Sequence, residues 1–333
     1  MYIEMVKNKV LVLGSIAFDY LMGFDENFLN ACSIDHEKGE YQSTITANSR
    51  IQHFGGCAGN ISYNLGLLNA GKVLLLGSVG KDFSSLGYQE HIKKFENIDI
   101  AVDQHDDLFT AACYIVNDIK ANQMIIFHGG ALDQSKHILL KDKIKNPENF
   151  LYAINSTQSV AAMENFAEQL YELKIPQIFD PGQVTPLFST ESLLDIIKKS
   201  DILIGNKFEI QQIKTKTEQS EEELIMHLNA LIKTKGAEGS ELMYKDNKGK
   251  IFKIDIPIAK PEKLIDSTGA GDGYRAGILT GLSLNMTLLD SCRLGSIIGS
   301  FVVETGGAQT QSYSLEDVRK RFLETYGYTP QEL

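Results

Sequence analysis

Short apolar runs alternate with amphipathic segments along most of the chain, and this alternation predicts an α/β fold. The runs are almost wholly apolar and too short for helices, which is typical of strands buried on both faces of a mostly parallel sheet. Helices on both faces then give three α/β/α layers. The expected strands span residues 9–14, 73–77, 151–154, 177–179 and 202–204, and the expected helices span 84–96, 160–173 and 191–199.

Three further segments favour strands but contain few residues suited to a core. Residues 41–50 are rich in β-forming side chains, and residues 110–117 and 123–128 flank a polar turn. Half-exposed strands of this kind predict a small sheet separate from the main one. We expect it to cover a site as a lid, contributed by about residues 20–52 and 107–129.

Composition and charge narrow the possible functions. The chain has 333 residues, 43% of them hydrophobic, and no composition shift or Pro-rich linker divides it. We therefore expect a single domain over residues 1–333. The formal net charge of -11 argues against a nucleic-acid or anionic-membrane binder, because those surfaces need clustered Lys and Arg.

Cysteine usage and hydropathy bear on the compartment. The four cysteines have no C-x-x-C spacing, so neither a disulfide framework nor a zinc site is predicted. Residues 1–9 carry charges on both sides of a short apolar patch, and we expect neither a signal peptide nor a spanning helix. A reducing cytoplasm fits this pattern best.

Two pairs of residues carry signals for the start of a helix. Ser220 and Glu223 form a capping box, which predicts a helix that extends to Lys235. Asn206 and Glu209 have the same spacing after an apolar run, so one helical face can present both to a hydrated Mg²⁺. The alternative is a helix-starting Asn with a capping Glu.

Residues 266–277 run from an apolar segment, through a glycine-spaced turn, into a helix. Gly269 and Gly271 lack Cβ atoms, so the backbone can direct successive N–H groups, together with the positive end of the helix, at one anion. Asp272 follows, where a carboxylate can accept a proton from a hydroxyl that attacks a phosphoryl group. The pattern predicts a kinase. Its alternative is a tight turn in which Asp272 only caps the helix.

Two other segments place polar side chains where ligands bind in α/β proteins. Ser15 and Asp19 follow the first expected strand, at the carboxyl edge of the sheet. Gly55 and Gly56 precede Asn60 in a glycine-rich stretch that opens a helix and admits a ligand to the backbone. The alternatives are a turn cap at Ser15, a solvated Asp19 and a glycine-lined contact between packed helices.

Taken together, these segments resemble the ribokinase family, also called the phosphofructokinase B family, over nearly the whole chain. Its landmarks occur in the family's order, and the string Asp-x-Thr-Gly-Ala-Gly-Asp is long and specific. The landmarks are Gly55-Gly56 with Asn60, Asn206-x-x-Glu209, Thr234-x-Gly236 with Gly239, and residues 266–272. The resemblance implies a ribokinase-like fold with a β lid.

The resemblance also implies roles for single residues. Phosphoryl transfer falls to Asp272 as the catalytic base and to the amides of Gly269, Ala270 and Gly271. Contacts with ATP fall to Asn206, Thr234, Gly236 and Gly239. Mg²⁺ is implied at Asn206 and Glu209, and a monovalent cation such as K⁺ at Asp266 and Thr268.

Within the family, residues 14–19, 55–60 and 275–277 are similar to bacterial and archaeal adenosine or nucleoside kinases. This similarity implies ribose contacts by Ser15, Asp19, Gly56 and Asn60, and contacts with the base by Phe127 and Gln183. Cys113 occupies a position where an aromatic residue is expected, which leaves the identity of the base open.

The leading hypothesis is ATP-dependent phosphorylation of the 5′-hydroxyl of a nucleoside, foremost adenosine, which gives AMP. A homodimer formed through the lid is a further expectation. One alternative acceptor is a sugar or sugar phosphate, although a phosphate would favour more lid cations than Arg50 and Lys120. The other alternative is a non-catalytic nucleotide-binding regulator, which would have no need for Asp272.

Overall fold

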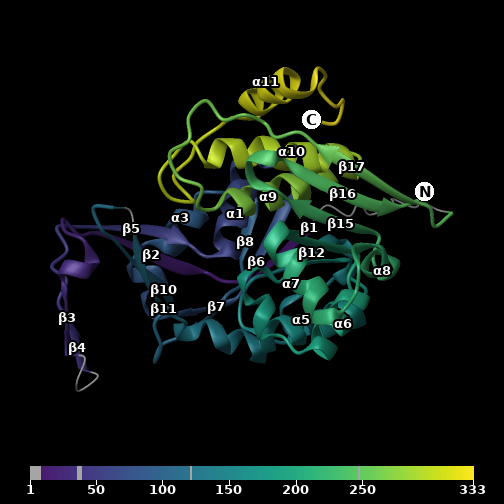
Figure 1. Cartoon of the computed structure of the whole chain (residues 1–333). Coiled ribbons are helices and arrows are strands. Elements are labelled where there is room, and N and C mark those ends of the chain that lie inside the picture. Colours follow the sequence, from purple (N-terminus) through teal and green to yellow (C-terminus); the bar gives the residue numbers. More distant parts are fainter. Residues whose placement is uncertain (1–8, 36–39, 121, 247) are drawn as a thin grey trace.

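The computed structural model describes residues 9–35, 40–120, 122–246 and 248–333. Its centre is a nine-stranded sheet in the order β17-β16-β15-β14-β13-β12-β1-β6-β8 (Figure 1). Neighbours pair in parallel except at the β15-β16-β17 edge, which is antiparallel. The strands are β1 (Lys9–Leu13), β6 (Lys72–Leu76), β8 (Ile98–Ile100), β12 (Phe150–Ser156), β13 (Gln177–Asp180), β14 (Ile202–Asn206), β15 (Ala230–Thr234), β16 (Ser240–Lys245) and β17 (Ile251–Ile256).

Helices cover both faces of this sheet, which confirms the predicted three-layer fold (Figure 1). In β1, Val12 packs in one buried cluster with Ile278, whereas Leu13 packs in another with Phe166. Because successive side chains of a strand point to opposite faces, a fully apolar strand fills both cores. One layer contains α1 (Cys57–Leu68), α9 (Ala270–Ser283) and α10 (Leu288–Val302), with α11 (Leu315–Tyr326) packed on α10; the other contains α5 (Val160–Glu172), α6 (Thr190–Lys198) and α7 (Lys207–Thr217).

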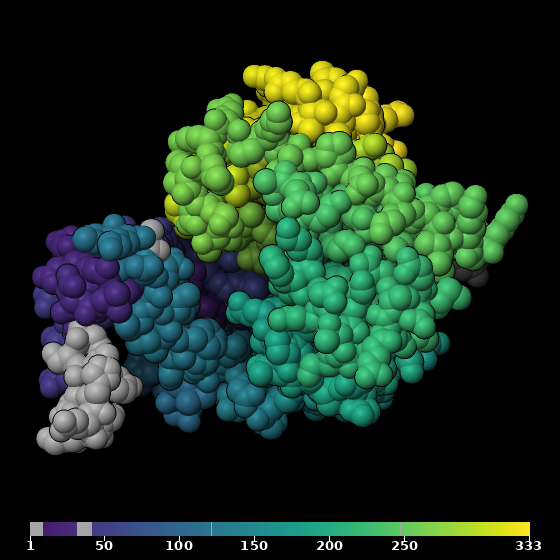
Figure 2. Space-filling model, in the orientation of Figure 1, coloured from purple at the N-terminus to yellow at the C-terminus, as the bar shows by residue number. Residues whose placement is uncertain are grey.

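A separate four-stranded sheet stands at one side of the main body, with a hollow where the two meet (Figure 2). Its strand order is β11-β10-β2-β5, and the predicted strand pair around residues 118–122 is present as β10 and β11. The strands are β2 (Ala17–Gly23), β5 (Ser49–Gly55), β10 (Ala111–Asn117) and β11 (Gln123–His128). Because β2 follows β1 after three residues, the small sheet joins the main sheet at its carboxyl edge.

The single strand expected over residues 41–50 is wrong. The chain instead forms β4 (Glu40–Ser43), which pairs with β3 (Cys32–Asp35), and then β5 in the small sheet. Asn48 and Ser49 mark the crossing, since the Asn48 N–H donates to the carbonyl of Gly23 and the Ser49 hydroxyl accepts from the Gly23 N–H. The remaining short strands, β7 (Ser78–Gly80) and β9 (Asp103–His105), pair with each other.

Two predicted helices also differ from the structure. The helix expected over residues 84–96 is divided by Gly87, whose φ of 83° is left-handed, into α2 (Asp82–Ser85) and α3 (Tyr88–Lys93). The capping box at Ser220 is confirmed, but α8 (Glu221–Leu224) and one 3-10 turn end before β15 begins. Residues 230–232 are buried between β14 and β16, so burial overrides the helical signal. A further short helix is α4 (Leu140–Lys143).

No helix in the described residues is long and apolar enough to cross a membrane. Most of the segment considered as a leader, residues 1–8, lies outside the described residues.

Candidate active site

The glycine-spaced turn opens helix α9, as its sequence predicts. Gly269 is the N-cap residue with a left-handed φ of 78°, and a Cβ there would lie 2.5 Å from Ala308 Cβ. The Ala270 N–H donates to the carbonyl of Ser267, whereas the amides of Gly271 and Asp272 have no backbone acceptor within the described ranges. The amide of Gly269 also has no backbone acceptor within these ranges, so the free donors at this helix start are those of Gly269, Gly271 and Asp272, and two of them belong to the predicted Gly269-Ala270-Gly271 set.

Asp272 lies in the first turn of α9, beside these free amides. Asn60 Nδ2 donates to Asp272 Oδ2 at 2.8 Å. Burial raises the pKa of Asp272 to about 6, against the opposing effects of the Arg275 guanidinium and the hydrogen bond from Asn60. A carboxylate whose pKa is close to neutral can both accept and release a proton, which suits a general base.

A buried ion pair fixes the helix that carries Asp272. Arg275 Nε and Nη2 donate to the two carboxylate oxygens of Asp180, at the end of β13, and Arg275 Nη1 donates to the carbonyl of Gly271 at 3.0 Å. The two side chains are 8% and 2% exposed, so neither charge has water to replace its partner. This pair locks the start of α9 to the carboxyl end of the sheet.

The second glycine turn brings the small sheet against the main body. A Cβ on Gly56 would lie 2.5 Å from the Ser15 carbonyl oxygen, and a Cβ on Gly55 would lie 2.2 Å from Asp19 Oδ2. Ser15 Oγ accepts the N–H of Cys57 at 2.9 Å, which matches the turn-cap alternative for Ser15. Burial and the nearby Asp266 carboxylate raise the pKa of Asp19 to about 6.

Strand register places Asp19 and Phe127 on one face of the small sheet. Phe127 pairs with Cys113, and Cys113 pairs with Asp19, so the three side chains form a row across β11, β10 and β2. Phe127 is 58% exposed and is free to contact a ligand. Gln183 is also exposed and lies in the 3-10 turn that follows β13.

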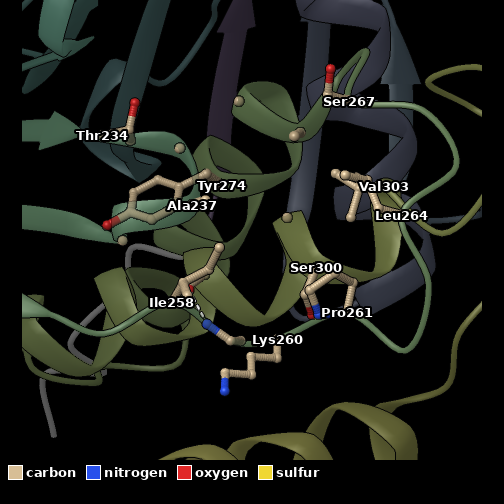
Figure 3. Close-up of a pocket in the computed structure, with 17 residues that line it drawn as sticks. Thr234, Ala237, Ile258, Lys260, Pro261, Leu264, Ser267, Tyr274, Ser300 and Val303 are labelled. Carbon is tan, nitrogen blue, oxygen red and sulfur yellow. Dashed lines mark hydrogen bonds between the residues drawn. The ribbon is translucent and has the colours of Figure 1, made fainter.

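A cavity of about 570 Å³ adjoins the start of α9 (Figure 3). It is bounded by the β15–β16 turn on one side and by α9 and α10 on the other, with apolar walls from Ile258, Leu264 and Val303. Its lining includes every one of Thr234, Gly236, Gly239, Ala270 and Gly271. The predicted ATP contacts and the glycine-spaced turn therefore meet in one cavity, except for Asn206, which does not line it.

A family model for pfkB carbohydrate kinases matches residues 7–314. The chain belongs to the pfkB family.

Relatives of this pfkB protein are similar over their whole length. The nucleoside kinase of Methanocaldococcus jannaschii is 31% identical over 94% of this chain and 96% of that protein. That of Methanothermobacter thermautotrophicus is 30% identical over 96% and 97%. The family makes this chain a phosphotransferase that acts on a hydroxyl acceptor.

Solved structures agree with this assignment. A nucleoside kinase structure from Methanocaldococcus jannaschii, described as an archaeal member of the ribokinase family, superposes with a TM-score of 0.83 at 29% identity, covering 95% of this chain and 98% of that one. A Burkholderia thailandensis nucleoside kinase in complex with inosine gives 0.79 at 29% identity, covering 96% and 99%. The predicted ribokinase-like fold is confirmed.

The residues considered for Mg²⁺ in this pfkB chain form a capping box. Asn206 Oδ1 accepts the N–H groups of Phe208 and Glu209, and Glu209 Oε2 accepts the Asn206 N–H at 2.7 Å. Burial raises the pKa of Glu209. Within the described part of the chain, no group of three or more His, Cys, Asp or Glu side chains is placed to hold a metal ion. One half-buried carboxylate fits Mg²⁺ held mainly by water and phosphates.

Asp266 and Thr268, which the family resemblance assigns to a monovalent cation, lie in the loop before α9. Asp266 Oδ1 accepts the Thr268 N–H at 2.9 Å, and Oδ2 accepts the Gly307 N–H at 3.1 Å. Although burial acts to raise it, these hydrogen bonds hold the pKa of Asp266 below its ordinary value. A carboxylate that stays charged and keeps spare lone pairs fits a monovalent cation, with Thr268 beside it.

Proposed function

We propose that this pfkB protein is an ATP-dependent nucleoside kinase that phosphorylates the 5′-hydroxyl of a purine ribonucleoside, with adenosine as the foremost acceptor and AMP as its product. The observation that carries the proposal is the row that puts Asp19 and Phe127 on one face of the small sheet. A carboxylate suits vicinal ribose hydroxyls, and an aromatic ring suits a flat base. The names of the full-length relatives and the inosine complex support the same class of acceptor.

In this proposal the ribose lies beneath the small sheet, which acts as a lid. Asp19 accepts from ribose hydroxyls. Gly56, which packs its backbone against Ser15, and Ser15, which accepts the Cys57 N–H, hold the turn beside the ribose. Gln183 reaches the base from the turn after β13. A lid that closes over this site would exclude water from the reacting groups.

The chemical step is an in-line displacement. The 5′-oxygen forms a bond to the γ-phosphorus while the bond between that phosphorus and the β–γ bridging oxygen breaks, and ADP leaves. Asp272 accepts the proton of the 5′-hydroxyl. The free amides of Gly271 and Asp272 donate to the phosphoryl oxygens, with Gly269 providing the left-handed turn that aims them. Thr234, Gly236 and Gly239 line the ATP side of the cavity.

The two ions belong to the same proposal. Glu209 and Asn206 would hold Mg²⁺ through water beside the ATP phosphates, and Asp266 and Thr268 would hold K⁺ beneath the anion-binding turn. Mg²⁺ would neutralise charge on the phosphates when bound. The side chains of Glu209, Asn206 and Asp266 contribute the geometry, since backbone N–H groups already fix their carboxylate or amide oxygens.

Glu209→Gln is expected to raise the Mg²⁺ concentration for half-maximal rate by about tenfold or more, with a smaller change in KM for the nucleoside, because the amide caps the helix but carries no charge for the ion. Glu223→Gln is the matched control, since Glu223 accepts the Ser220 N–H at 2.7 Å in an equivalent capping box at α8. Steady-state rates against Mg²⁺ measure both. Equal Mg²⁺ curves for the two variants would remove Glu209 from the metal site.

We also propose a homodimer formed through the small sheet. Ile51 and Ile125, which are 54% and 57% exposed, lie on the same sheet face as Phe127. A second copy that packs on the row of Ile51 and Ile125, and leaves the neighbouring row of Asp19 and Phe127 to the nucleoside, would remove apolar surface from water. Light scattering should report a dimer for the wild type and a monomer for Ile125→Glu. A wild type that is monomeric at tens of micromolar would contradict the proposal.

A further inference from the structure

A chain of hydrogen bonds between buried side chains runs from the end of the small sheet to Asp272. Tyr88 Oη donates to the Gly55 carbonyl at 2.7 Å. Gln309 Nε2 donates to Tyr88 Oη at 2.8 Å and to Asn60 Oδ1 at 2.9 Å. Asn60 Nδ2 then donates to Asp272 Oδ2 at 2.8 Å. Gln309, in the loop between α10 and α11, thus joins Tyr88 to Asn60 without touching the carboxylate itself.

The donor-to-acceptor direction of these hydrogen bonds is fixed at the Gly55 carbonyl, the end farthest from Asp272. A backbone carbonyl only accepts, so Tyr88 must give its single proton to Gly55, and burial keeps that proton in place by raising the pKa of the phenol. The Tyr88 oxygen is then an acceptor, which requires Gln309 to present its amino group. With both hydrogens of that group donated, Asn60 must turn its oxygen to Gln309 and its nitrogen to Asp272.

The glycine-rich start of α1 makes room for this arrangement. A Cβ on Gly59 would lie 1.8 Å from Tyr88 Oη and 3.0 Å from Gln309 Nε2. Asn60 and Gln309 are 5% and 4% exposed, so water cannot substitute for either partner. The network therefore explains why residue 59 is a glycine, a residue to which the sequence analysis assigned no role.

We propose that Gln309 is a positioning residue for phosphoryl transfer: it holds the Asn60 amide in the orientation that donates to the carboxylate of Asp272. The inference rests on the proposed function, in which Asp272 is the base. If Gln309 is lost, the Asn60 amide can rotate and present its oxygen to the carboxylate, which moves or frees Asp272. When a catalytic group is held less firmly, kcat falls more than substrate binding does.

The protein contains a matched control pair, Gln311 and Asn64, in which Asn64 lies one turn of α1 after Asn60. Gln311 Nε2 donates to Asn64 Oδ1 at 2.9 Å, and Tyr313 Oη donates to the same oxygen at 2.8 Å. Gln311 is 1% exposed and Asn64 is fully buried, so this pair matches Gln309 and Asn60 in chemistry and burial. It does not contact Asp272. A purely structural role predicts that both glutamines matter to the same extent.

The test compares Gln309→Met with Gln311→Met in the full chain, with melting temperature, kcat and the KM for ATP as readouts. We expect similar losses of melting temperature, a kcat lowered about tenfold or more for Gln309→Met, and a kcat within about twofold of wild type for Gln311→Met. KM for ATP should stay unchanged in both. Equal kcat for the two variants would overturn the proposal.

Two further variants keep the test decisive. In an Asn60→Ala background, Gln309→Met should cause no additional loss of kcat, because Gln309 acts through Asn60; an independent, additive loss overturns the proposal. Tyr88→Phe removes one hydroxyl from the chain and should lower kcat by less than Gln309→Met but more than Gln311→Met. Failure of the proposed function is distinct, since it would appear as retained activity in Asp272→Asn.

Discussion

Asp272→Asn is expected to lower kcat by about 10²–10⁴-fold while folding and ATP binding stay nearly intact. The amide has the shape of the carboxylate and can still accept the hydrogen bond from Asn60, but it cannot take the proton of the 5′-hydroxyl. Folding should be preserved for an electrostatic reason. Because the pKa of Asp272 is raised from 3.8 to about 6, ionisation destabilises the folded state as pH rises through that window. A neutral side chain at pH 8 avoids this cost.

The wild-type pH profile provides the companion measurement. Both Asp19 and Asp272 have a pKa raised to about 6, and both must be ionised in the free enzyme for the proposed roles. kcat/KM should therefore fall as pH drops through about 6, and the slope of its logarithm against pH should exceed one. A melting curve at each pH separates titration from unfolding.

An Asp272→Asn enzyme that keeps more than about a tenth of wild-type kcat would show that Asp272 is not the base.

The fold was largely predictable because local patterns and burial agree in the parallel strands. Leu13 and Val12 sit in an apolar run that can only be buried on both faces, and the structure buries them so. The prediction failed where two local signals competed. Residues 230–232 follow a true capping box, but they form strand β15 and pair with β14. Gly87 divides a predicted helix although the periodicity of apolar residues continues across it.

The site was predictable where its chemistry is contiguous in sequence. Asp272 and Gly269 lie in one short string, and the turn geometry follows from the glycines. The pair of Arg275 with Asp180 joins residues 95 positions apart, and Gln309 meets Asn60 across 249 positions. No spacing rule connects such partners, because the fold alone brings them together. For the first pair, the available signal was an arginine within the otherwise apolar stretch of residues 273–279.

Adenosine is expected to exceed 2′-deoxyadenosine in kcat/KM by at least about tenfold, and free sugars by more. Asp19 is half-buried, so a substrate without one vicinal hydroxyl leaves the carboxylate short of a donor as well as losing the bond. Phe127 gains contact from any flat purine but none from ribose or fructose alone. Inosine should therefore approach adenosine more closely than deoxyadenosine does.

Asp19→Ala provides the control for this preference. Without the carboxylate, adenosine and deoxyadenosine should be phosphorylated with kcat/KM values within about threefold of each other, while both remain better than ribose. A preference for adenosine that survives in Asp19→Ala would assign the ribose contact to other residues, such as Asn60.

One measurement tests the central claim most directly: kcat/KM for adenosine, inosine, 2′-deoxyadenosine, ribose and fructose, determined with the same enzyme, ATP and Mg²⁺ concentrations. The lid row of Asp19, Cys113 and Phe127 predicts a purine ribonucleoside at the top, the deoxynucleoside at least about tenfold lower and the free sugars lowest. A free sugar at the top would contradict the nucleoside assignment.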